Sequence, residues 1–218
     1  MRLLAIDTST PTAAVAVHDG DKVAAERAVT DARKHGELVA PLIDEVLQAT
    51  GMAPRDLTAI GVGLGPGPYT GLRVGIVTAK VMGEALGIPV YGTCSLDGFA
   101  VQAIQRQLVE PGEEFAVLTD ARRKEVYWAR YRGRDRADGP AVDKPAVLAP
   151  DLSCPVVGPG AALYSEHFND IRGELVASAG ALAELFLDKA REDAEPDELR
   201  PLYLRRPDTS GPGNSMVS

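Results

Sequence analysis

The sequence has few of the residues from which metal centres and nucleophilic active sites are usually built. Its 218 residues include two cysteines and three histidines. No pair of histidines has metal-ligand spacing, so a zinc or iron site is not expected. Two cysteines make no disulfide framework, and we expect Cys94 and Cys154 to be reduced thiols of a cytoplasmic protein. No Gly-x-Ser-x-Gly segment occurs, which argues against one large class of hydrolases.

Long apolar runs and an excess of positive charge are absent as well. No stretch of about 18 apolar residues occurs, so no membrane-spanning helix is expected. The first strand reaches Asp7 too soon for a secretory signal. A net charge of −8 disfavours attraction of the whole surface to nucleic acid or to an anionic membrane. Contact with a polyanion would therefore need a local basic patch.

The hydrophobic pattern predicts an α/β protein with mixed sheets flanked by helices. Three short strands come first, and helices and strands then alternate. An Asp-Gly turn joins the second and third strands. The predicted strands cover residues 3–6, 13–17, 23–29, 57–62, 90–92, 115–120 and 126–131, and the predicted helices cover residues 35–50, 72–86, 96–108 and 179–189.

The second half of the chain echoes the first. A strand that ends at Asp120, a turn and another strand repeat the arrangement around Asp7, and a Gly-Pro-Gly segment precedes a helix in both halves. We therefore predict two lobes of related topology, an N-terminal lobe over residues 1–105 and a smaller C-terminal lobe over residues 106–206. Residues 207–218 are rich in Gly, Ser and Pro and are predicted to be a disordered tail.

A glycine-rich turn over residues 63–71 lies between a predicted strand and a predicted helix. This arrangement directs backbone N–H groups at an anion. The Asp-Thr-Ser segment ends another strand, where open sheets place their crevice, and its carboxylate and hydroxyls suit a metal-bound phosphate. The alternative is a turn that only closes a hairpin. The candidate phosphate-binding residues are Asp7, Thr8, Ser9, Gly65, Gly67 and Thr70, with Thr70 as the expected helix N-cap.

The helix predicted over residues 72–86 is apolar on nearly every side. Gly71, Gly75, Ala79 and Gly83 form a stripe that lets another backbone approach closely. A helix of this kind is buried nearly all round, whereas a sheet covers only one of its sides. We interpret it as a docking surface, with a core helix as the alternative. The predicted interface residues are Leu38, Val39, Leu42, Ile43, Val46, Leu72, Arg73, Ile76, Ala79, Lys80, Met82 and Gly83.

Basic residues replace glycines in the corresponding turn of the second half. Arg122, Arg123 and Lys124 stand where a phosphate clamp would need backbone amides, and further arginines up to Arg136 alternate with aromatic residues. This segment is either a local contact for RNA or a nucleotide, or an edge hairpin that its charges protect from aggregation.

Several segments together resemble the TsaB (YeaZ) family over nearly the whole chain. They are Leu-Ala-Ile-Asp-Thr-Ser at 4–9, Gly-Pro-Gly-Pro-Tyr-Thr-Gly-Leu-Arg-Val-Gly at 65–75, Ala-Lys at 79–80, Asp-Ala-Arg at 120–122, Glu-Val-Tyr at 125–127 and Pro-Leu-Tyr-Leu-Arg at 201–205. The resemblance implies two lobes of the actin/hexokinase/Hsp70-like fold with ribonuclease-H-like topology.

The resemblance also implies a function. Members of the family are non-catalytic subunits of the bacterial machinery that adds threonylcarbamoyl to N6 of adenosine 37 in tRNA. They bind the transferase TsaD through a four-helix bundle, work with the ATPase TsaE, and form homodimers through the same surface when isolated. No cofactor is implied beyond a weakly bound nucleotide at the partner interface, and contact with tRNA is expected only through the complex. The alternatives are an ATP-binding phosphotransferase-like enzyme and a glycoprotease-like peptidase, although this chain lacks the His-x-x-x-His pair of TsaD-like relatives.

Overall fold

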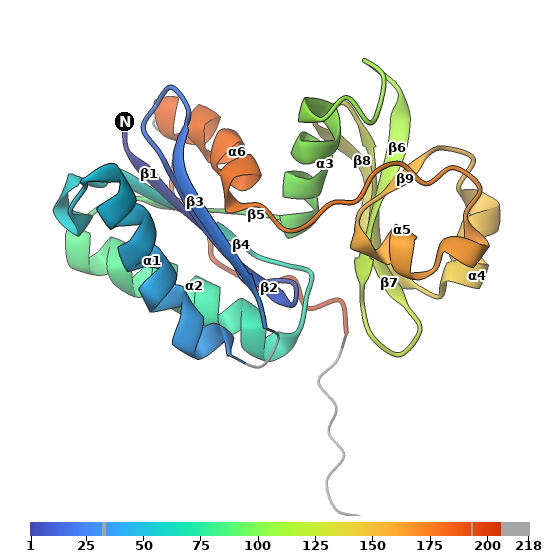
Figure 1. The fold of residues 1–218 in the computed structure, drawn as a ribbon, viewed down its shortest axis with the longest axis horizontal. Helices are drawn as coiled ribbons and strands as arrows, with labels where there is room; N and C mark the ends of the chain where they lie inside the picture. Colours follow the sequence, from blue (N-terminus) through green and yellow to red (C-terminus); the bar gives the residue numbers. More distant parts are fainter. Residues whose placement is uncertain (32–33, 193, 206–218) are drawn as a thin grey trace, which may run out of the picture.

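Two lobes lie side by side, and each is built on one mixed sheet (Figure 1). The computed structural model describes residues 1–31, 34–192 and 194–205. The tail predicted over residues 207–218 lies outside the described residues. Across the described chain, no helix combines the length and the hydropathy needed to cross a membrane.

The first sheet has the strand order β3-β2-β1-β4-β5. Its strands are β1 (Leu3–Asp7), β2 (Thr12–His18), β3 (Val23–Thr30), β4 (Ala59–Gly63) and β5 (Val90–Thr93). The first three are antiparallel neighbours, whereas β4 is parallel to β1 and β5 is parallel to β4. Three antiparallel strands followed by parallel ones define the ribonuclease-H-like topology, so the predicted fold class is confirmed.

Helices cover both faces of this sheet. On one face, α1 (His35–Thr50) and α2 (Tyr69–Leu86) lie next to each other, and α6 (Ala179–Arg191) covers the other face (Figure 1). The central strands β1 and β2 are consequently buried at every residue, and they are composed mainly of Ala, Val, Leu and Ile. A strand covered on both sides needs a continuous apolar run of this kind.

The second sheet repeats the order of the first, as β8-β7-β6-β9. Its strands are β6 (Glu114–Asp120), β7 (Val126–Arg132), β8 (Asp135–Asp143) and β9 (Val156–Val157). The remaining elements are α3 (Ser95–Gln105), α4 (Pro145–Leu148), α5 (Pro159–Leu163) and the 3₁₀ turns at Pro54–Asp56, Ala149–Asp151 and Ser165–His167. The predicted internal repeat is confirmed, since α5 follows β9 as α2 follows β4.

The predicted boundary between the lobes is wrong at both ends. Phe99 of α3, which this prediction assigns to the first lobe, packs in one core with Phe115 and Tyr131 of the second sheet. Helix α6 packs against the first sheet, where the Phe186 ring takes the space that a Cβ on Gly61 would need. Further on, the Leu202 N–H donates to the carbonyl oxygen of Leu64 over 2.8 Å. The second lobe is therefore an insertion into the first. An amphipathic pattern shows that a helix has an apolar face, but it does not show which sheet that face covers.

Candidate functional site

The structure brings the Asp-Thr-Ser turn and the glycine-rich turn together, and it leaves no space between them. The Thr8 hydroxyl donates to the carbonyl oxygen of Gly71 over 2.8 Å and accepts from the Gly75 N–H over 3.2 Å. A Cβ added to Gly67 would lie 2.0 Å from the carbonyl oxygen of Ser9, and one added to Gly71 would lie 2.6 Å from that of Thr8. The small-residue stripe of α2 is therefore pressed against this chain's own first turn.

The Asp7 carboxylate, which would hold a metal-bound phosphate, is enclosed. One of its oxygens, Oδ1, accepts from the Ser9 N–H over 2.8 Å and from the Ser95 hydroxyl over 3.2 Å. Burial of this carboxyl raises its pKa above the ordinary value. Asp7, Thr8, Ser9, Gly65 and Gly67 are all buried. This geometry favours the hairpin-closing interpretation over phosphate binding.

Thr70 is not the N-cap of α2, and it does not join these residues. The cap is Pro68, whose backbone is extended, and Thr70 is an exposed residue within the helix. Proline has no side-chain acceptor, so no side chain caps the first N–H groups of this helix. His35 lies in the first turn of α1, and its Nε2 is 2.9 Å from the carbonyl oxygen of Thr10.

Most of the predicted interface residues are core residues of the isolated chain. Arg73 and Lys80 are exposed, and Leu38 and Met82 are half-buried. The others are buried between the helices and the first sheet: Val39, Leu42, Ile43, Val46, Leu72, Ile76, Ala79 and Gly83. The expectation that Leu42, Val46 and Ile76 form an exposed face is wrong. The widest apolar face of each helix faces the sheet, because that contact removes the most apolar surface from water.

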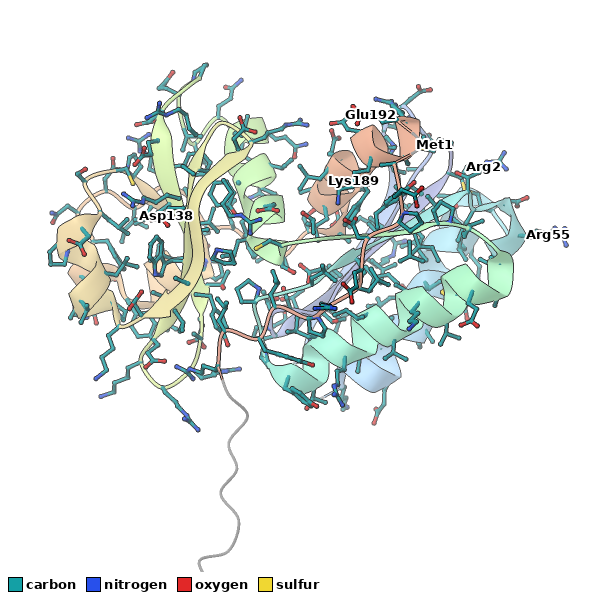
Figure 2. The ribbon with its side chains drawn as sticks, turned by 180° about the vertical axis from the view of Figure 1, so that it is seen from behind. Met1, Arg2, Arg55, Asp138, Lys189 and Glu192 are labelled. Carbon is teal, nitrogen blue, oxygen red and sulfur yellow. The ribbon has the colours of Figure 1, made fainter. Side chains whose placement is uncertain are left out.

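A different face of α2 is open. Val77 and Val81, one helical turn apart, are 56% and 58% exposed. Ala85 continues this row and is exposed, and Val74 is half-buried beside it. We call these four residues the docking face; α2 carries them on the outside of the first lobe (Figure 2). Their position opposite the small-residue stripe is the signal that identifies them in the sequence.

The turn after β6 repeats the turn after β1. The Arg122 N–H donates to Asp120 Oδ1 over 2.8 Å, as the Ser9 N–H does to Asp7 Oδ1. The predicted correspondence of the two aspartates is confirmed. Unlike its counterpart, the second turn places three successive side-chain-bearing residues in the left-handed region, with φ of 61° at Arg122, 54° at Arg123 and 61° at Lys124.

The two cysteines are free, as predicted. Burial raises the pKa of the Cys94 thiol to about 12, so this cysteine is protonated and a poor nucleophile. Within the part of the chain that the structure describes, no group of three or more His, Cys, Asp and Glu side chains is arranged to hold a metal ion.

The strand order, the repeat and the helices on both faces define a two-lobed α/β protein of the actin/hexokinase-like class. The glycine-rich turn of its first lobe is closed by packing. A family model described as TsaD, tRNA N6-adenosine threonylcarbamoyltransferase, matches residues 24–165. The chain is 43% identical over 211 residues to an uncharacterized protein of Mycobacterium tuberculosis, covering 94% of this chain and 92% of the other.

Relatives with assigned names identify the family to which the chain belongs. The chain is 32% identical over 222 residues to the tRNA threonylcarbamoyladenosine biosynthesis protein TsaB of Bacillus subtilis, covering 94% of each. The solved structure of YeaZ from Pseudomonas aeruginosa superposes with a TM-score of 0.79 at 29% identity, covering 93% of this chain and 99% of the other. The chain belongs to the TsaB (YeaZ) family, and it has a role in tRNA threonylcarbamoyladenosine biosynthesis.

Proposed function

We propose that this chain is a non-catalytic subunit of the threonylcarbamoyladenosine machinery that binds a TsaD-type transferase through the docking face. The observation that carries the proposal is the exposure of Val77 and Val81 on a helix whose opposite side is fully packed. Contiguous exposed apolar side chains with polar neighbours mark protein-protein contact sites. Arg73, Lys80 and Glu84 supply such neighbours along the same helix.

The similarity of the chain to the transferase itself supports a partner of this type. The family model that matches residues 24–165 is a TsaD model, and a tRNA N6-adenosine threonylcarbamoyltransferase of Geotalea uraniireducens is 33% identical over 183 residues. A relative with the same core has counterparts of α1 and α2. Two similar helix pairs can pack face to face around a local twofold axis, as the subunits of a symmetric dimer do.

The bonding of the candidate chemical groups supports a non-catalytic role. The Asp7 carboxylate, the Thr8 hydroxyl and the His35 ring each contact backbone groups of the first lobe. We propose further that the chain needs no cofactor of its own, that any nucleotide lies at the partner interface, and that TsaE is a second partner. The isolated chain is expected to form homodimers through the docking face, and to reside in the cytoplasm.

Capture of the transferase tests the proposal. Val81→Asp places a carboxylate at the centre of the docking face, and loss of a central contact typically costs 2 kcal/mol or more, which is about 30-fold in Kd. Val147→Asp is the matched control, because Val147 is 62% exposed and lies on α4 in the other lobe. We expect purified TsaD to bind the control variant normally and Val81→Asp at least about 30-fold more weakly. Equal binding of the two variants, with equal melting temperatures, would remove the docking face from the proposal.

A further inference from the structure

A pocket of about 240 Å³ lies where the two lobes meet. The first turn of α2 forms one side, the turn after β6 forms another, and the chain segment around Tyr203 contributes a third. Gly67 and Pro68 of the glycine-rich turn border it, whereas Asp7, Thr8 and Ser9 do not line it. The pocket therefore adjoins the closed turn, and it is open to solvent.

Aromatic rings line one wall of this pocket. Tyr69 and Tyr203 stack with their ring centroids 5.0 Å apart and their planes 25° from parallel. The guanidinium of Arg73 lies 4.2 Å above the Tyr69 ring, and its Nε donates to the Tyr203 hydroxyl over 3.3 Å. Both tyrosines keep about two-fifths of their surface exposed. Rings held in this way form a platform to which a nucleic-acid base can add its own π-face.

The opposite wall is basic and its backbone is strained. Arg122, Arg123 and Arg205 line the pocket together with one carboxylate, Asp120. Arg122 pairs with Asp120 over 3.4 Å and Arg205 pairs with Glu125, so the excess of positive charge at this wall is small, although the chain as a whole has a net charge of −8. The left-handed φ values at Arg122, Arg123 and Lys124 are unfavourable for residues with a Cβ, and such conformations cluster at functional sites. Here they hold two arginines at the mouth of the pocket.

We propose that this pocket binds a single-stranded nucleotide of the tRNA, with its base on the Tyr203 ring and its phosphate at the Arg122–Arg123 turn. Aromatic stacking combined with basic side chains is the chemistry by which proteins hold unpaired nucleotides. The inference rests on the proposed function, in which tRNA is what the machinery modifies. It gives this subunit a direct contact with the RNA.

Binding of a labelled, unmodified tRNA transcript tests the inference, with the full-length chain in complex with TsaD and with the full-length chain alone. Tyr203→Leu removes the ring but keeps apolar bulk, and it should weaken binding at least about fivefold without changing the salt dependence. Arg123→Gln removes one phosphate contact and should lower the slope of log K against log salt by about 0.7. Arg55→Gln is the matched control, because Arg55 lies at the outer end of the first lobe (Figure 2), and it should alter neither quantity.

Each remaining outcome of these binding experiments either supports or overturns the inference. Tyr203→Phe keeps the ring and should bind RNA as the wild type does. If Tyr203→Leu does not fold, the RNA binding of Arg123→Gln and its salt dependence test the inference. RNA binding by Tyr203→Leu and Arg123→Gln that matches Arg55→Gln overturns the inference. Binding of millimolar AMP that leaves RNA binding unchanged also overturns it, since the pocket would then hold a free nucleotide and not the RNA. Loss of TsaD capture with unchanged RNA binding would assign the pocket to a partner side chain. Val81→Asp probes only the docking face, so its result separates a failure of the proposed function from a failure of the RNA-binding inference.

Discussion

Gly67→Ala is the substitution that most directly separates packing from phosphate binding in the glycine-rich turn. The added Cβ would lie 2.0 Å from the carbonyl oxygen of Ser9, and the turn would have to move by about 1.4 Å to reach the 3.4 Å at which ordinary contact begins. The obstacle is backbone on both sides, so no side-chain rotation relieves it. The glycine is required by the close approach of two chain segments.

The expected cost follows from two contributions. Overpacking of a closed interior costs about 1–3 kcal/mol. A displaced Ser9 also weakens the buried hydrogen bond between its N–H and Asp7, which is worth about 1 kcal/mol. We expect a loss of about 3 kcal/mol in the free energy of unfolding, which for a chain of this size lowers the melting temperature by about 6–12 °C.

Urea denaturation and calorimetric melting measure this loss, and Gly36→Ala is the matched control. Gly36 lies in the first turn of α1, and a Cβ there would have no neighbour within 4 Å. Alanine should therefore stabilise that helix by up to about 1 kcal/mol. If the glycine-rich turn instead served to bind phosphate, the result would be different. Gly67→Ala would then fold as stably as the wild type but lose Mg-ATP binding measured by calorimetry, and this outcome would refute the packing argument.

Two further substitutions test the core of the first lobe and the packing of α3 on the second sheet. Because burial raises the folded-state pKa of Asp7 above its unfolded value of 3.8, the ionised carboxyl lowers stability above the folded pKa, and this cost disappears as the pH falls towards 3.8. Asp7→Asn should flatten that part of the curve of stability against pH, and an unchanged curve would contradict the assignment. The Tyr131 hydroxyl in β7 donates to Asp97 Oδ1 in α3 over 2.8 Å, so Tyr131→Phe should lower the free energy of unfolding by about 1–2 kcal/mol in urea titrations; a loss below about 0.5 kcal/mol would mean that this bond does not stabilise the fold.

The strands of the first lobe were predictable because they are short apolar runs with clear turn signals. β8 was harder to see, since Asp135, Arg136 and Asp138 interrupt its pattern, and all three are exposed at the sheet edge. Edge strands carry such charges to prevent pairing with other chains, which removes the alternation that marks a strand. Helix α2 begins at Tyr69, three residues before its predicted start, because its N-cap is Pro68.

The docking face was only half predictable. Apolar coverage singled out α2, but it could not divide the apolar residues of this helix between sheet and solvent. Ile76 and Val77 are adjacent and equally apolar, yet one is 6% and the other 56% exposed. Only the position of the first sheet separates them. The pocket between the lobes depends on Tyr203, which is more than 120 positions from Tyr69 in the sequence, and no local pattern joins two such residues.

The placement of α6 on the first sheet bears on how this protein can be dissected. A fragment ending at residue 105 would leave Gly61 facing a void where the Phe186 ring belongs, and it would expose the apolar underside of β1 and β2. A self-sufficient first lobe would need its segments spliced, with the end of β5 joined directly to the residues that lead into α6, because α3 packs in the core of the second lobe. Limited proteolysis within the inserted lobe would then leave two polypeptides that remain associated through a shared core.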